Sequence, residues 1–440
     1  MSCEFDVTKR NDIFKKSVSR SLIAKVASII LSLINLRVTL SYLDVESYGI
    51  WITIFSITSW IVYFDLGLGN GLRNKLTEAV HKNDGLKAKR IIATSYVTLS
   101  IIGVFLFVLI SLAISFFDIE NFLNLNNVSS LKIVILIVVL FTVINFILSL
   151  YKQLNNSLYK TEYNEISILV FQSLCLVTVI ILDWCFSPSL LLLAIGFGFS
   201  QTFVSLIFTY IFFSRNRDFI PNLKAYSKEI NKDILSQGSM FFLIQISMMV
   251  IFTTDNVIIT KYLGPESVTT YSITFNLYQK ALIVSSIALA PIWALYKNAI
   301  LDNDINWIIN TIKKSNFIFF IFSLLIIIGS FFTKDIIKVW LGRDLSYPDY
   351  LIQFCAIFIM IRIFSDIYMY YLNAAGVIKL QMYLYVFGAI MNIPLSIWLI
   401  KNTTLGSSGV ILATIITMLP FVILMPVKVY LDICKLRDDG

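Results

Sequence analysis

Residues 131–151 read LKIVILIVVLFTVINFILSLY, and this stretch decides the class of fold. Lys132 is its only charged residue. A helix that crosses about 30 Å of hydrocarbon needs about 20 mostly apolar residues, which matches the length of this stretch. Because the bilayer core offers no water to backbone N–H and C=O groups, an apolar run of this length predicts a transmembrane helix.

The composition extends this prediction to the whole chain. The 440 residues are 58% hydrophobic and 14% charged, with a mean hydropathy of +0.81, which is more apolar surface than a soluble domain can bury. About twelve transmembrane helices are expected, near residues 21–43, 48–66, 91–117, 131–151, 165–184, 189–213, 237–262, 267–290, 315–333, 351–373, 381–400 and 408–431. The predicted fold class is therefore an all-α integral membrane protein.

The basic residues predict the orientation of these helices. If residue 1 is cytoplasmic, 25 lysines and arginines fall on the cytoplasmic side of the predicted spans and only six on the other. Basic residues prefer the cytoplasmic side, so both termini are expected there. The same distribution accounts for the net charge of +8. It also argues against a nucleic-acid partner, because the basic residues are spread over seven segments and not gathered on one face.

A short motif recurs at half the length of the chain. Residues 42–47 read YLDVES and residues 262–267 read YLGPES, an offset of 220 in 440 residues. At this offset Asn35 corresponds to Asp255, Trp51 to Tyr271 and Phe55 to Phe275.

An internal repeat of six helices predicts two parallel, pseudo-symmetric lobes around a central cavity. The predicted division is an N-terminal lobe over 1–213, a cytoplasmic linker over 214–236 and a C-terminal lobe over 237–440. In transporters with such repeats the substrate site lies near the bilayer midplane, and the lobes rock to give alternating access.

Several charged residues lie well inside the predicted spans, and those that matter here are Lys25, Arg37, Asp255, Lys280, Arg362 and Asp366. A charge near the bilayer centre costs at least about 2.5 kcal/mol, so each one needs a partner or a wet cavity. Arg362 and Asp366 have the spacing of an intrahelical ion pair that neutralises itself. Lys25 lies close enough to the inner end of its span to extend its ammonium group to the membrane surface.

The remaining balance is positive. Lys25, Arg37 and Lys280 against Asp255 predict a positively lined cavity that suits an anionic substrate, such as a phosphate or pyrophosphate group. In this hypothesis Arg37 and Lys280 hold the anionic headgroup, and Asp255 is either an ion-coupling site or their counter-ion.

A glycine-rich segment follows the second predicted span. Residues 65–75 read DLGLGNGLRNK, with Asp65, Gly67, Gly69, Gly71 and Arg73. The segment lacks the strand context and the GK[ST] ending of a phosphate loop. We expect these glycines to form a sharp cytoplasmic turn and to let helices approach closely.

The chain carries no recognisable catalytic or metal-binding motif. Its one histidine, His81, falls in a polar segment, and neither a Ser/His/Asp set nor an HExxH motif can be assembled. No catalytic residue, metal site or cofactor is therefore expected.

Three motifs resemble a known family: YGIW at 48–51, FDLGLGNGLRNKL at 64–76 and TDNVIITKYLGPESVTTY at 254–271. They are similar to polysaccharide flippases of the multidrug/oligosaccharidyl-lipid/polysaccharide exporter superfamily, in the style of Wzx-type O-antigen flippases. The resemblance implies that an oligosaccharide on undecaprenyl pyrophosphate is turned from the inner to the outer leaflet of a bacterial inner membrane, with coupling to an unspecified ion. It places the family's cation-lined cavity at Lys25, Arg37 and Lys280, and its acidic residue at Asp255. It implies the lipid-linked oligosaccharide and the bilayer as partners, and leaves other glycan assembly proteins open.

Four alternatives remain. A cation-coupled multidrug exporter of the same superfamily would favour an acidic cavity, whereas the intramembrane charges here sum to a positive value. Lipid II flippases typically carry more helices. A major-facilitator transporter would carry an Asp-Arg-x-Gly-Arg core where residues 70–75 read NGLRNK. A glycan polymerase or lipid-linked glycosyltransferase would need a large outer loop, and the longest outer segment, 334–350, is short.

Overall fold

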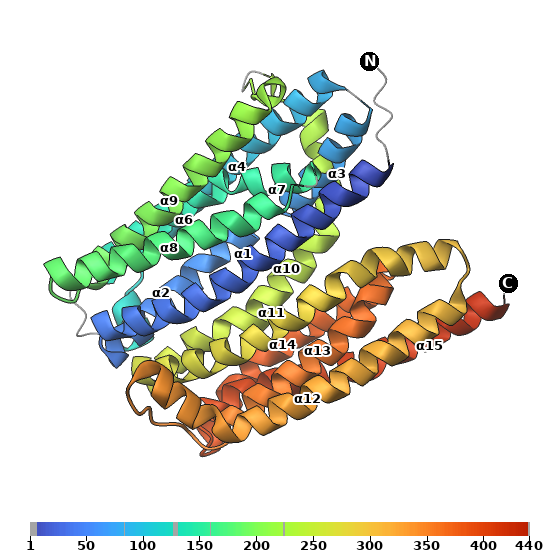
Figure 1. Ribbon diagram of the computed structural model, residues 1–440. Coiled ribbons are helices and arrows are strands. Elements are labelled where there is room, and N and C mark those ends of the chain that lie inside the picture. The colour runs from blue at the N-terminus through green and yellow to red at the C-terminus, as the bar shows by residue number, and fades with distance from the viewer. Residues whose placement is uncertain (1–6, 83, 126–130, 159, 223–224, 439–440) are drawn as a thin grey trace. The chain divides into compact units, whose positions relative to one another are not determined.

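The computed structural model describes residues 7–82, 84–125, 131–158, 160–222 and 225–438. Within these ranges the chain forms helices joined by short turns and loops, without strands (Figure 1). The first nine helices are α1 (Val7–Tyr42), α2 (Val45–Tyr63), α3 (Leu68–His81), α4 (Gly85–Phe116), α5 (Ile119–Leu123), α6 (Leu131–Leu148), α7 (Leu150–Ser157), α8 (Glu162–Cys185) and α9 (Leu190–Arg215). After the 3-10 turn η1 (Arg217–Phe219) follow α10 (Lys228–Leu263), α11 (Pro265–Leu301), α12 (Ile305–Leu341), α13 (Leu351–Ala374), α14 (Ile378–Asn402) and α15 (Ser408–Asp438).

Eleven helical segments within the described ranges are long and apolar enough to cross a membrane. The predicted span 267–290 is also helical, as part of α11, but it is not among these eleven segments. It carries Lys280 and many hydroxyl and amide side chains, which lower its hydropathy. The predicted class, an all-α integral membrane protein, is confirmed.

Acidic side chains cap the starts of several long helices. Asp44 accepts a hydrogen bond at 2.6 Å from the backbone N–H of Ser47, in the first turn of α2. Asp84 before α4 and Asp304 before α12 cap their helices in the same way. Such caps satisfy N–H groups that have no partner within the helix. The helices therefore begin where polar residues interrupt the apolar runs.

The internal repeat is visible in the helix boundaries and in local ring packing. Val45 and Pro265, which begin α2 and α11, are 220 residues apart, and each follows a long helix directly. The corresponding ring pairs also lie in contact: Trp51 and Phe55 have centroids 6.2 Å apart, and Tyr271 and Phe275 have centroids 5.7 Å apart. The same local arrangement thus recurs in each half of the chain.

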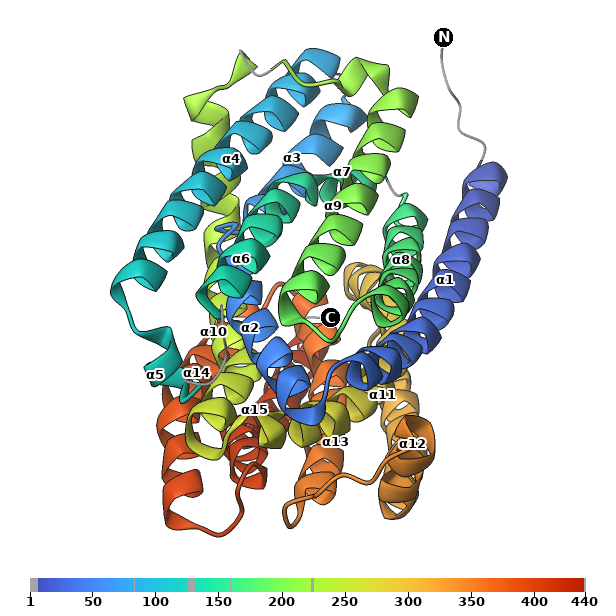
Figure 2. The same cartoon turned by 90° about the vertical axis from the view of Figure 1, so that its left-hand side faces the viewer.

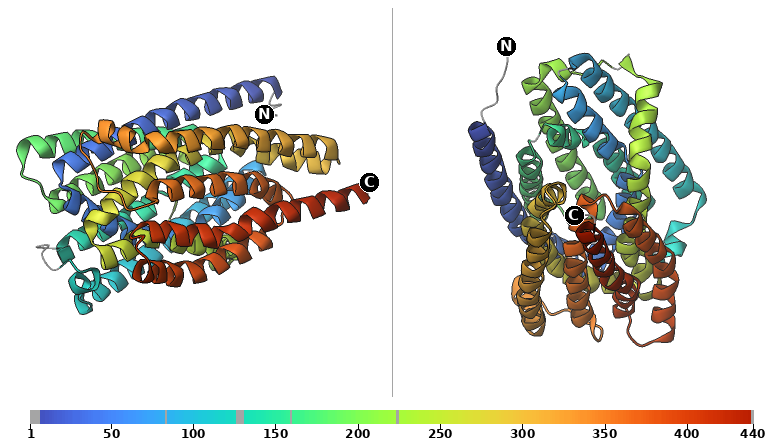
Figure 3. Two further views of the ribbon diagram at one scale, coloured as in Figure 1. Left: turned by 90° about the horizontal axis from the view of Figure 1, so that it is seen from below. Right: turned by 90° about the vertical axis from the view of Figure 1, so that its right-hand side faces the viewer.

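The chain forms two compact units, Met1–Phe242 and Leu243–Gly440. In the first unit α1 packs along α8, and α6 packs against α9 (Figure 2). In the second unit α13 packs against α11, α12 and α15 (Figure 3). The division falls inside α10. The segment 214–236, predicted as a linker, is helical from Lys228 onward.

The first turns of α10 are held by the first unit, which explains why the helix starts so early. Asn231 accepts a hydrogen bond at 2.9 Å from the hydroxyl of Thr98 in α4. Asp233 forms a 3.6 Å ion pair with Lys75 in α3. Ile234 is fully buried, and its carbonyl oxygen lies only 2.3 Å from where a Cβ atom on Gly71 would sit. Gly71 therefore lets α3 and α10 approach closely.

We predict that Gly71→Ala lowers the thermal stability of the protein. The added methyl group would meet backbone atoms of Ile234, and such overpacking typically costs about 1–3 kcal/mol. Gly85→Ala is the control, because a Cβ atom there meets nothing within 4 Å. Both variants are purified in detergent, and fluorescence-detected gel filtration after heating measures their melting temperatures. Equal melting temperatures would contradict the proposed role of Gly71.

Candidate functional site

Asp255 is a buried carboxylate within the membrane-spanning part of α10. It is 3% exposed and lies inside the apolar segment Phe242–Leu263. Its Oδ2 accepts a hydrogen bond at 2.6 Å from the hydroxyl of Tyr271 in α11. Its Oδ1 has no hydrogen-bond partner among the described residues. A buried oxygen without a partner is costly, so Asp255 is only half satisfied.

A chain of aromatic rings leads away from Asp255 inside the second unit. Tyr271 stacks on Phe275, and Phe275 stacks on Phe358 of α13 with centroids 5.5 Å apart. Phe358 in turn contacts Phe252 of α10 at 5.9 Å. The Cζ atom of Arg362 lies 5.0 Å from the centroid of Phe252, a cation–π distance. The buried acid and the buried guanidinium are therefore joined by continuous ring packing.

Arg362 has two further partners at its end of this chain. Its Nη1 donates a hydrogen bond at 2.8 Å to the hydroxyl of Tyr385 in α14. Its Nη2 lies 3.7 Å from Oδ1 of Asp366, one turn along α13. Arg362 and Asp366 are 8% and 7% exposed. Their opposite charges compensate each other away from water, as the i, i+4 spacing predicts.

The three predicted headgroup cations lie in two different units. Lys25 and Arg37 belong to α1 in the first unit, where Lys25 is partly buried and Arg37 is exposed. Lys280 belongs to α11 in the second unit and is partly buried. In the part of the chain that the structure describes, no carboxylate forms an ion pair with any of the three. Their convergence on one cavity remains a prediction.

The glycine-rich segment is a helix-capping turn. Asp65 accepts hydrogen bonds from the backbone N–H groups of Gly67 and Gly69, at 2.9 and 3.1 Å. Leu66 and Gly67 both have positive φ angles, 54° and 73°, which turn the chain from α2 into α3. Burial raises the pKa of Asp65, and the two N–H groups partly offset this. Since these N–H groups are taken by the carboxylate, they are not free to cradle a phosphate. Arg73 is exposed.

Sequence reasoning missed several polar partners. Nδ2 of Asn35 donates to Oε1 of Gln172 at 2.6 Å and to its backbone oxygen at 2.8 Å, linking α1 to α8. Tyr271 entered the sequence comparison only as the counterpart of Trp51, not as a donor to Asp255. No sequence motif singled out Tyr385 as a partner of Arg362. A systematic search for tyrosines and amides on the polar faces of apolar helices could have identified these residues as candidates.

No group of three or more His, Cys, Asp or Glu side chains within the described ranges could hold a metal ion.

We predict that Arg362→Met destabilises the protein strongly, because it leaves Asp366 as a buried charge without its partner. Losing one member of a buried pair typically costs about 3–5 kcal/mol. Adding Asp366→Asn should recover most of this loss, and thermal unfolding of the two single variants and the double variant measures the coupling. If the double variant were no more stable than Arg362→Met alone, loss of the ion pair would not be the cause of the destabilisation.

Comparisons with known proteins identify the family of this chain. The model of the family described as "Polysaccharide biosynthesis protein" matches residues 14–296. A "Putative O-antigen export protein" of Yersinia pseudotuberculosis is 22% identical over 378 residues, covering 81% of this chain and 82% of the relative. A "Putative O-antigen transporter" of Salmonella typhimurium (strain LT2) is 23% identical over 410 residues, covering 90% of this chain and 91% of that protein.

Solved structures show the same fold. An inward-facing multidrug resistance MATE family transporter of the MOP superfamily aligns with a TM-score of 0.79 at 16% identity, covering 96% of this chain and 99% of the other. A MOP superfamily transporter from Pyrococcus furiosus, described by the reversed polarity of its binding pocket, aligns with a TM-score of 0.67 at 16% identity, covering 96% and 97%. The chain therefore belongs to the polysaccharide biosynthesis protein family, and it is a multi-pass membrane protein with the fold of MATE family transporters.

Proposed function

We propose that this chain flips an undecaprenyl-pyrophosphate-linked oligosaccharide, the repeat unit of an O-antigen or related polysaccharide, across the bacterial inner membrane by alternating access. The family and the names of the two O-antigen relatives support a glycan substrate. Both termini are proposed to be cytoplasmic, on the distribution of basic residues.

The pairing of the intramembrane charges carries the proposal for an anionic headgroup. Arg362 and Asp366 compensate each other, and Asp255 accepts its hydrogen bond from an uncharged phenol. Lys25, Arg37 and Lys280 form no ion pair with a carboxylate among the described residues. The surplus charge of the spans is therefore positive, which supports an anionic ligand. A pyrophosphate supplies the charge-assisted acceptors that such cations bind.

The main rival is a cation-coupled multidrug exporter. Its support is the shared fold with MATE family transporters, and fold alone does not select a substrate. A cationic drug would gain little from three uncompensated cations, which favours the anionic lipid. A lipid-linked glycan polymerase is disfavoured because the names of both relatives indicate export or transport.

The test is a deletion strain in which inner-leaflet lipid-linked oligosaccharide and surface glycan are both measured. We expect the oligosaccharide to accumulate without the protein, and the wild-type chain to restore surface glycan. Arg37→Gln and Lys280→Gln should each remove this restoration while membrane levels stay unchanged. Lys297→Gln is the matched control, since Lys297 is an exposed cation of the same helix as Lys280. Full restoration by both site variants would refute the headgroup assignment.

Asp255 is proposed as the ion-coupling residue, because one of its oxygens has no described partner while the other is held by Tyr271. In proteoliposomes, Asp255→Asn should make transport independent of an imposed proton or sodium gradient. Glu266→Gln, which changes an exposed acid at the start of α11, should keep the wild-type response. A gradient response in Asp255→Asn equal to that of the wild type would remove the coupling role.

A further inference from the structure

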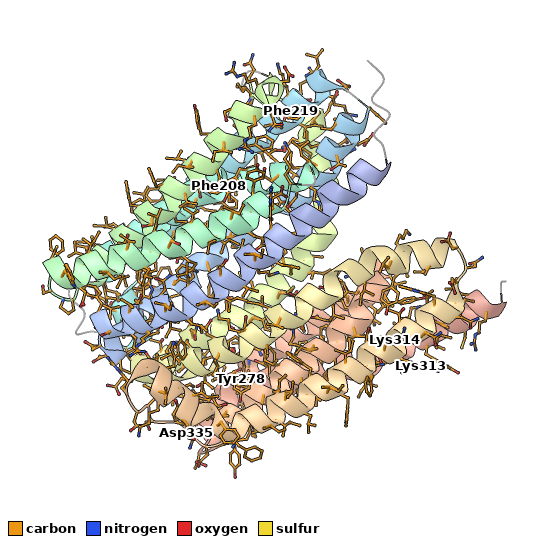
Figure 4. All side chains as sticks on the ribbon, viewed as in Figure 1. Phe208, Phe219, Tyr278, Lys313, Lys314 and Asp335 are labelled. Carbon is orange, nitrogen blue, oxygen red and sulfur yellow. The ribbon has the colours of Figure 1, made fainter. Side chains whose placement is uncertain are left out.

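A polar recess lies at the C-terminal end of α12. It has a volume of about 360 Å³ and is lined by Lys334, Asp335, Lys338, Asp344, Leu345 and Tyr347. We call it the Tyr347 recess. Ligand pockets typically measure about 300–1,000 Å³, so it is large enough for a small ligand. Figure 4 shows Asp335 at this end of α12, while Lys313 and Lys314 lie toward the other end.

The recess contains positively and negatively charged side chains close to one another. Nζ of Lys338 lies 2.9 Å from Oδ2 of Asp344, which joins α12 to the following loop. Nζ of Lys334 lies 5.7 Å from the ring centroid of Tyr347. Lys334 and Lys338 are one helical turn apart, with Asp335 beside them. The recess therefore offers two cationic donors and two anionic acceptors, without a net charge.

The loop that completes the recess is held at several points. Gly342 ends α12 with φ of 71°, and its N–H donates to the carbonyl of Lys338 at 2.8 Å. At the other end the N–H of Phe354 donates to the carbonyl of Tyr350 at 2.9 Å. Pro348 lies close to Gly406, in the loop between α14 and α15. Such restraint lowers the entropy that a bound ligand would otherwise have to overcome.

Tyr347 contributes the one aromatic surface of the recess. Its side chain is half-buried, and burial, with a smaller effect of the Asp344 charge, raises its pKa to about 12. The phenol therefore stays protonated at physiological pH. A tyrosine in this position presents an apolar ring face together with a hydroxyl that can donate or accept a hydrogen bond.

These properties select one ligand chemistry. A free anion would face two carboxylates, and a metal ion would face two ammonium groups. An uncharged sugar carries hydroxyl groups that need both donors and acceptors, and C–H faces that pack on an aromatic ring. The recess supplies both within one small volume.

In the proposed orientation the recess lies on the side opposite the cytoplasm. Of the six basic residues expected outside, five belong to the second unit: Lys261, Lys334, Lys338, Arg343 and Lys401. Basic residues are disfavoured on that side, which makes the two lysines of the recess unusual for their location.

We propose that the Tyr347 recess binds an uncharged sugar residue of the transported glycan on the side where the glycan is released. This inference rests on the proposed function, because it takes the glycan as substrate. The recess itself lies wholly within the end of α12 and the loop to α13.

The test measures binding directly on the purified full-length chain in nanodiscs. The probes are N-acetylglucosamine, galactose and the repeat-unit oligosaccharide released by mild acid from the host's own glycan. Saturation-transfer NMR measures the binding of each probe. We expect Tyr347→Ala to weaken binding at least about tenfold. Tyr347→Phe should stay within a few-fold, because it keeps the ring. Tyr350→Ala is the control, since Tyr350 is an exposed tyrosine of the same loop that does not line the recess.

Absence of binding by all probes, or equal binding by the wild type, Tyr347→Ala and Tyr350→Ala, would overturn the inference. Melting temperatures identify any variant that fails to fold. If Tyr347→Ala fails to fold, binding is measured on Tyr347→Phe and Asp335→Asn. The deletion-strain assay separates this inference from the proposed function. If the wild-type chain restores surface glycan but sugar binding does not depend on Tyr347, the proposed sugar site is refuted and the proposed function stands. Tyr347-dependent binding without restored glycan refutes the flippase function alone.

Discussion

Everything in this molecule depends on one constraint, which is that a charged or polar group within hydrocarbon has to find a partner inside the protein. The cost of leaving such a group alone is several kcal/mol, a large fraction of the stability of a typical domain. The second unit meets this constraint by pairing Arg362 with Asp366 and Tyr385, and by giving Asp255 a phenol. Groups that the constraint leaves incompletely satisfied, such as Oδ1 of Asp255, are where function is to be sought.

The two halves of the chain share a repeat but solve this problem differently. At equivalent positions Asn35 and Asp255 are both buried. Nδ2 of Asn35 donates to Gln172 of α8, while its Oδ1 has no partner among the described residues. Its half of the chain carries Trp51 at the position of Tyr271, and an indole offers no hydroxyl. Asp255 instead receives the hydroxyl of Tyr271. A carboxylate can take up a proton as well as bind a cation, whereas an amide oxygen can bind a cation but does not take up a proton at physiological pH. The divergence therefore favours Asp255 over Asn35 as a residue for proton coupling.

The fold that this chain shares with drug exporters does not by itself determine what is carried. A MATE family transporter and this chain agree in architecture at 16% identity, so most of their side chains differ. The sign of the charges inside the spans is the property on which an anionic lipid and a cationic drug differ most. Within the spans Asp366 pairs with Arg362 and Asp255 accepts from Tyr271. Lys25, Arg37 and Lys280 form no ion pair with a carboxylate among the described residues. Family membership and charge balance thus support the same class of substrate from independent observations.

The amino-acid sequence alone determined the class of fold, because the thickness of the bilayer sets the length of an apolar run such as 131–151, whatever the rest of the chain does. It also determined the spacing of Arg362 and Asp366, since both lie on one helix and helical geometry is local. Only the tertiary structure decided which side chains meet across helices. Asn35 and Gln172 are 137 residues apart, and the approach of α3 to α10 at Gly71 joins segments separated by most of the first unit. Such contacts depend on the packing of whole helices against one another, and periodicity and hydropathy, which describe one helix at a time, hold no information about them.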